Sequence, residues 1–183
     1  DNPLGVDDHH HVFEDGASPL SSLLTNDSDA EGNELFVELN GLDGNNGGTL
    51  GTGDAGELSL NPNGDFDDLA TGESRTTSFT YTVRDSEGGS AVATVTVTVH
   101  GINDNPLAEN DAFTVQADTA TFLGNLLNND SDAEGDAMGV ETIDGDTGSN
   151  GGIFTLDAAG NLHLNPNGDF DAGALGATRE TRP

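Results

Sequence analysis

Three separated segments of this sequence occur twice, in the same order and at nearly the same spacing. The matching pairs are residues 1–4 with 104–107, 26–32 with 129–135, and 61–67 with 165–171. The first two pairs are displaced by 103 residues and the third by 104, so one residue is inserted between them. A chain that repeats itself at such a period is built from tandem units. We therefore expect one domain in residues 1–104 and a second in residues 105–183.

The strongest strand signal lies at the end of the first copy, in residues 91–99. From residue 93 on, an apolar residue alternates with threonine, and this period of two in β-branched residues predicts a strand. Residues 78–83 predict another strand. Residues 8–13, 34–39 and 57–60 predict weaker ones between clusters of Asp, Asn, Gly and Pro. The fold class that we expect is all-β, with tandem immunoglobulin-like β-sandwiches.

The second copy ends at Pro183, before any counterpart of residues 79–83 or 91–99. We therefore expect the second sandwich to lack its last two strands, which would expose core side chains and open sheet edges. Two interpretations remain open. Either the sequence is a piece of a longer chain, as its start at Asp1 without an initiator Met also indicates, or another chain supplies the strands by exchange.

The chain carries 34 acidic and 4 basic side chains, a net charge of −30, and no Cys. This charge repels phosphate groups, so we expect no nucleic acid partner. No apolar run approaches the ~18 residues of a membrane helix, so we expect no membrane insertion. The sequence offers no thiolate nucleophile, no phosphate-binding loop and no clear Ser, His and Asp constellation. We expect that the protein is not an enzyme.

Each copy contains Asp-Ser-Asp-Ala-Glu-Gly, which places three carboxylates at alternating positions before a glycine. Hard cations with about 6 to 8 oxygen ligands bind such clusters, so calcium is the expected cofactor. These carboxylates are Asp27, Asp29, Glu31, Asp130, Asp132 and Glu134. An EF-hand with Glu38 as its last ligand is disfavoured, because residues 35, 37 and 39 alternate as in a strand.

The run from His9 to His11 is a candidate transition-metal site, because His9 and His11 share one strand face. The second copy has no histidine at the corresponding positions. His100 and His163 are expected to be isolated histidines.

Four motifs resemble the cadherin-like repeats of bacterial surface proteins, including the VCBS and dystroglycan-type families. They are Phe13-Glu14-Asp15-Gly16, Asp27-Ser28-Asp29, Val83-Arg84-Asp85-Ser86 and the linker 101–106, Gly-Ile-Asn-Asp-Asn-Pro. Gly101 replaces the leading Asp of the family's linker motif. Asp65-Phe66-Asp67 occupies the place of the family's Leu-Asp-Arg-Glu motif. The resemblance covers essentially the whole chain.

The resemblance implies that calcium binds where successive domains meet. The implied ligands at the internal junction are Glu14, Asp65 or Asp67, Asn103, Asp104, Asn105, Asp130 and Asp132. By the same logic, Asp27, Asp29 and Asp85 would form half of a site shared with a preceding domain. Crowded carboxylates repel one another without metal, so we expect a mobile metal-free linker that calcium stiffens.

The function implied by the resemblance is that of a structural extender in a large bacterial surface or secreted adhesin, which acts in cell adhesion, aggregation or biofilm formation. The expected location is extracellular. The expected partners are neighbouring repeats of the same polypeptide, with homophilic or strand-exchange contacts left open. The alternative is a calcium-dependent module that binds polysaccharide or itself. With no Trp and one Tyr, aromatic platforms for sugars are scarce.

Overall fold

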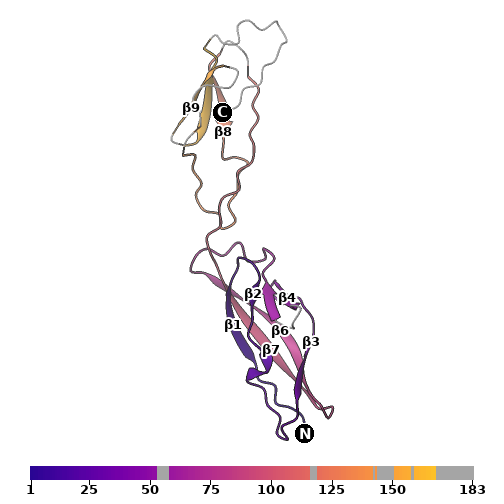
Figure 1. The fold of residues 1–183 in the computed structure, drawn as a ribbon. Helices are drawn as coiled ribbons and strands as arrows, with labels where there is room; N and C mark the ends of the chain where they lie inside the picture. Colours follow the sequence, from indigo (N-terminus) through magenta and orange to yellow (C-terminus); the bar gives the residue numbers. More distant parts are fainter. Residues whose placement is uncertain (53–57, 116–118, 142, 144–150, 158, 168–183) are drawn as a thin grey trace. The chain divides into compact units, whose positions relative to one another are not determined.

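The computed structural model describes residues 1–52, 58–115, 119–141, 143, 151–157 and 159–167. The chain divides into two compact units, Asp1–Asp104 and Asn105–Pro183. Apart from one short 3₁₀ helix, the regular structure of the described residues consists of strands (Figure 1). None of the described segments is a helix of the length and hydropathy needed to span a bilayer. The expected all-β class is confirmed.

The first unit is a sandwich of a four-stranded and a three-stranded sheet. Its elements are β1 (Asp8–Phe13), β2 (Ser18–Pro19), η1 (Leu23–Thr25), β3 (Leu35–Leu39), β4 (Thr49–Thr52), β5 (Leu58–Asn61), β6 (Ser74–Asp85) and β7 (Ser90–His100). The larger sheet has the order β1-β7-β6-β3 and the smaller the order β2-β5-β4. β1 runs parallel to β7, whereas the other neighbouring strands of this unit are antiparallel.

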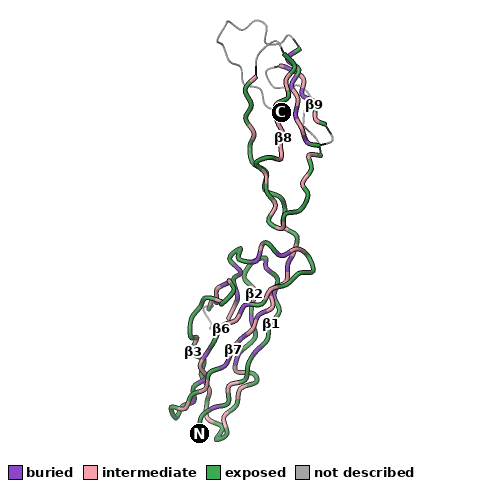
Figure 2. The backbone as a smooth tube through the Cα atoms, turned by 180° about the vertical axis from the view of Figure 1, so that it is seen from behind, coloured by how far each residue is buried: buried purple, intermediate pink, exposed green. Residues whose placement is uncertain are grey.

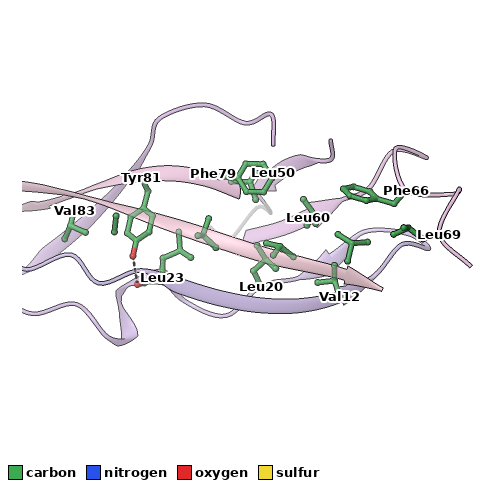
Figure 3. Close-up of a cluster of buried hydrophobic side chains, with 14 residues drawn as sticks. Val12, Leu20, Leu23, Leu50, Leu60, Phe66, Leu69, Phe79, Tyr81 and Val83 are labelled. Atoms are coloured by element: carbon green, nitrogen blue, oxygen red, sulfur yellow. Dashed lines mark hydrogen bonds between the residues drawn. The ribbon is translucent and has the colours of Figure 1, made fainter. Parts of the chain in front are cut away.

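The core of the first unit lies between these sheets (Figure 3). Val95, Val97 and Val99 of β7 are fully buried, and the residues between them are only partly buried. The same cluster contains Leu60 from β5 and Phe66 from the following turn, both fully buried. Figure 2 shows how burial changes along the strands. Alternation in the sequence therefore directs one face of β7 into the core, where removal of apolar surface from water stabilises the fold.

The second unit contains one antiparallel sheet of order β8-β10-β9. Its strands are β8 (Thr121–Asn125), β9 (Ile153–Leu156) and β10 (Asn161–Asn165). The repeat spacing relates them to β2, β4 and β5, so this sheet is a copy of the smaller sheet of the first unit. Phe154, Leu162 and Leu164 are its buried apolar side chains.

The larger sheet has no counterpart among the described residues of the second unit. Residues 111–115 and 138–141 occupy the sequence positions of β1 and β3 but form no strand. In the first unit, β1 and β3 each pair with one strand of the β6–β7 hairpin. The counterpart of that hairpin would begin at about residue 178, outside the described residues. Among the described residues, these two segments therefore have no strand of a second large sheet to pair with.

Candidate functional site

The first aspartate of the repeated Asp-Ser-Asp loop is held in the same way in both copies. Asp27 Oδ1 accepts a hydrogen bond from the amide of Val6 at 2.7 Å, and Asp130 Oδ1 accepts one from the amide of Glu109 at 2.8 Å. An equivalent backbone bridge also ties each loop to the segment that precedes it. The same loop and the same tie to the preceding segment therefore form in both units.

The second aspartate of the loop stabilises the turn that follows it. Asp29 Oδ1 accepts hydrogen bonds from the amides of Glu31 at 2.9 Å and Asn33 at 3.0 Å. In the second copy, Asp132 Oδ1 accepts one from the amide of Asp136 at 2.8 Å. Such side-chain to backbone bonds explain why Asp is favoured in turns. They occupy one carboxylate oxygen of Asp29 and leave the other for a further partner.

Three carboxylates of the first unit each have a buried oxygen without a hydrogen-bond partner. These atoms are Asp29 Oδ2, Asp85 Oδ2 and Glu14 Oε2. Glu14 is only 3% exposed and Asp85 only 6%. A buried charged oxygen that lacks a donor is costly, and a bound cation would offset that cost. All three residues were predicted as calcium ligands, and carboxylate oxygens are the donors that a hard cation takes.

Asp85 lies at the end of β6, at the end of the first unit where the chain begins (Figure 1). Its Oδ1 accepts hydrogen bonds from the amides of Glu87 at 2.9 Å and Gly89 at 2.7 Å. A Cβ atom at Gly89 would collide with Asp85 Oδ2 and lie 2.9 Å from the carbonyl oxygen of Asp1. The carboxylate of Glu31 lies 3.3 Å from the amino nitrogen of Asp1. Oxygen atoms of Asp1, Glu31 and Asp85 therefore gather at this end.

Glu14 follows β1 at the opposite end of the first unit. Its Oε1 accepts a hydrogen bond from the amide of Ile102 at 2.6 Å, which ties the start of the linker to β1. Burial raises the pKa of Glu14, and the charges of Asp104, Asp67 and Asp15 raise it further. The negative charges of Asp67 and Asp104 therefore act on the Glu14 carboxyl.

The remaining predicted ligands do not gather at one place in the structure. Asp65 is exposed, and its Oδ2 accepts a hydrogen bond from the amide of Gly48 at 2.7 Å, so Asp67 is the better candidate of the two. The Asn103 side chain donates to the carbonyl of Asp104 at 2.6 Å. The other predicted ligands, Asn105, Asp130, Asp132 and Glu134, belong to the second unit. Over the described ranges, no three His, Asp or Glu side chains are arranged closely enough to hold a metal ion.

Two interpretations of individual side chains are settled by the structure. Glu38 lies in β3 and forms an ion pair with Arg84 of β6 at 2.6 Å, so the EF-hand interpretation is wrong. The expectation that His100 is isolated is also wrong, because its Nε2 lies 3.1 Å from His11 Nδ1. Contacts between β1 and β7 produce this histidine pair, and sequence spacing gave no sign of it.

A buried network around Tyr81 was also missed by the sequence analysis. The hydroxyl of Tyr81 donates to Asp8 Oδ2 at 2.6 Å and lies 3.4 Å from Asp27 Oδ2 (Figure 3 shows the ring). Burial raises the pKa of Asp27, and the nearby charge of Asp8 raises it further. Asp111 is the repeat counterpart of Asp8, and its pKa is raised by burial and by the charge of Asp130. Each unit thus holds a repulsive aspartate pair behind the calcium-candidate loop.

These shifts predict an unusual pH dependence in the absence of metal. The pKa values of Asp27 and Asp111 lie above their ordinary value of 3.8, and that of Glu14 lies above 4.5. At pH values between the ordinary and the raised pKa of these groups, the folded chain binds more protons than the unfolded chain. The free energy of unfolding therefore rises as pH falls. This added stability is complete at pH values below the ordinary pKa values and is lost as pH rises through the raised pKa values. Asp68 and Asp157 oppose it, because their pKa values are lowered, but both are exposed.

We therefore expect the chelator-treated protein to resist urea better at mildly acidic pH than at neutral pH. Asp27→Asn keeps the acceptor for the Val6 amide but removes the charge, so it should reduce this pH dependence. Urea titrations across this pH range measure both effects. A stability that falls steadily with acidification would contradict the prediction.

Comparison with known families now bears on these features. Residues 1–101 match the bacterial cadherin-like domain family. The chain belongs to this family. Residues 103–177 match the bacterial Ig domain family. This cadherin-like chain gives no match to a curated protein sequence.

Solved structures similar to the cadherin-like chain include Drosophila N-cadherin EC1-4, at 19% identity and a TM-score of 0.45. The match covers 87% of the cadherin-like chain and 40% of the N-cadherin chain. Mouse clustered PcdhgC3 EC1-3 is 21% identical with a TM-score of 0.38, and covers 94% of this chain and 59% of that one. The cadherin-like chain thus spans less than two thirds of either structure.

Both matched families consist of structural and adhesion domains rather than enzymes. Cadherin-like domains generally bind calcium, and both families are typically extracellular. The chain is therefore an adhesin-type repeat segment.

Proposed function

We propose that the cadherin-like chain is a calcium-stiffened repeat segment of a large bacterial surface or secreted adhesin, with one repeat in residues 1–104 and the next in 105–183. The observation that carries the proposal is the set of buried, unpartnered carboxylate oxygens of Glu14, Asp29 and Asp85. Two of these residues, Glu14 and Asp85, lie at opposite ends of the first unit. Residues at both ends are what a repeat needs if cations are to act at each of its connections.

The proposed ligands at the linker end are Glu14, Asp67, Asn103 and Asp104, and those at the other end are Asp29, Glu31 and Asp85. Asp27, Asp65, Asn105, Asp130, Asp132 and Glu134 complete the proposed set. A bound calcium ion would supply positive charge where Glu14, Asp67 and Asp104 repel one another. Ile102 and the amides around Asp85 hold the carboxylates in place for it. Relief of repulsion would restrict the motion of the linker.

Small-angle X-ray scattering tests the stiffening. We expect the chain to sample a wide range of dimensions in chelator and a narrower range in calcium, because the linker carboxylates are neutralised. The double variant Glu14→Gln, Asp104→Asn should respond less than Asp43→Asn, an exposed carboxylate outside the proposed set. Identical scattering profiles of the parent chain in chelator and in calcium would refute the proposed function.

The carbohydrate-binding alternative gains no support. Tyr81, the one tyrosine, is fully buried and hydrogen-bonded to Asp8 inside the first unit. It therefore cannot serve as a stacking platform for a sugar.

A further inference from the structure

Two histidines meet on the outer face of the larger sheet of the first unit. His11 lies in β1 and His100 ends β7, and the parallel register places His11 opposite Thr98 and His100 opposite Phe13. His11 Nδ1 lies 3.1 Å from His100 Nε2, with the ring planes within 17° of each other. The ring of Phe13 lies beside that of His100, with 6.0 Å between centroids. Because β1 and β7 are adjacent strands, their pairing brings the two imidazole rings together.

The spacing of these nitrogen atoms suits a first-row transition ion. Imidazole nitrogens bind zinc at about 2.0–2.1 Å, so two neighbouring ligands of one ion lie about 3 Å apart. The observed separation of 3.1 Å meets this requirement, but the ring centroids are 5.4 Å apart, so the two nitrogen atoms point at each other and both rings must rotate for their lone pairs to share one ion. Without metal, the pair accommodates one N–H···N hydrogen bond, since one ring then acts as donor and the other as acceptor.

The surroundings distinguish this pair from the carboxylate clusters. The partners of His11 and His100 are a second imidazole and an aromatic ring, and imidazole favours zinc, copper or nickel over calcium. His11 is exposed, so water can complete the coordination shell. The net charge of −30 also raises the local concentration of cations.

We propose that His11 Nδ1 and His100 Nε2 form a two-histidine site for a divalent first-row transition ion, with Zn²⁺ as the representative ion. The site joins β1 to β7 and uses none of the side chains proposed as calcium ligands. In this proposal His100 takes the place of His9, which the sequence paired with His11. His10 points to the other face of β1, where its Nδ1 lies 3.4 Å from Ser21 Oγ.

Titration of the full chain with ZnCl₂ in excess calcium tests the site, because calcium competes with zinc for the carboxylates. Calorimetry should show one saturable zinc site, whose affinity falls at least about tenfold in His11→Gln and in His100→Gln. The matched controls His9→Gln and His163→Gln should keep it. Long-range ¹H–¹⁵N spectra of the parent chain should show zinc-dependent shifts at His11 Nδ1 and His100 Nε2, a readout that does not depend on whether a variant folds.

Three outcomes of the zinc titration would contradict the two-histidine site. Absence of a saturable zinc site in calcium would overturn the proposal, as would zinc-dependent shifts confined to other histidines. Equal loss of affinity in His9→Gln and His11→Gln would assign binding to the His9–His11 run instead of the pair. Each outcome is separate from the calcium proposal, because calcium is present throughout.

Discussion

Replacement of Leu60 by alanine is expected to lower the free energy of unfolding of the first unit by about 2–5 kcal/mol. Leu60 is fully buried between the sheets, in a cluster to which β1, β5, β6 and β7 all contribute. Removal of its side-chain methyl groups leaves a cavity that the surrounding strands cannot fill completely. The effect should be among the largest that any single substitution in this chain produces.

The repeat supplies the control. Leu164 is the counterpart of Leu60 and is 2% exposed in the second unit. Because Tyr81 is the one tyrosine and the chain has no Trp, tyrosine fluorescence reports unfolding of the first unit alone. Leu60→Ala should move the fluorescence transition in urea to lower concentration, and Leu164→Ala should leave it in place. A shift of similar size in both variants would show that the two units unfold together.

Calcium is expected to raise the melting temperature of the first unit by about 6–22 °C at about 10 mM. Extracellular calcium modules have dissociation constants of about 10⁻⁴–10⁻³ M, so binding to the folded state alone adds about 1.4–2.7 kcal/mol per site. For a domain of this size, each kcal/mol corresponds to about 4–8 °C. Thermal unfolding followed by Tyr81 fluorescence, in calcium and in chelator, measures the shift.

Substitutions assign the gain to particular carboxylates. Glu14→Gln and Asp85→Asn each remove one charged oxygen that is buried without a partner, so each should reduce the calcium-dependent shift. Asp43→Asn removes the same charge from an exposed position and should preserve it. An equal response in all three variants would mean that calcium acts by general screening of the net charge. No shift in the parent chain would exclude binding at either end of the first unit.

Local patterns in the sequence predicted much of the fold. Residues 8–13 and 91–99 form β1 and β7 because their alternating side chains suit a strand with one face in the core. The segments 34–39, 57–60 and 78–83 overlap β3, β5 and β6. β2 and β4 were missed, because Ser18–Pro19 and the Gly-containing Thr49–Thr52 carry weak strand propensity. Pairing with β5 makes them strands.

The candidate site was predictable only where one short segment determines its geometry. The Asp-Ser-Asp loops repeat because their hydrogen bonds are mostly local. The contacts of Tyr81 with Asp8 and of His11 with His100 join residues more than 70 positions apart. Such contacts depend on strand register, which the parallel pairing of β1 with β7 sets and which no local pattern specifies.

The parallel pairing of β1 with β7 also determines how the first unit would carry mechanical load. Six residue pairs join these strands, from Asp8 with Val95 to Phe13 with His100. Tension applied through the chain pulls the start of β1 and the end of β7 in opposite directions along the strands. The backbone hydrogen bonds are then sheared together, whereas an antiparallel pair pulled from one end would be unzipped one bond at a time. The first unit should therefore resist extension more strongly than an antiparallel terminal pair would allow.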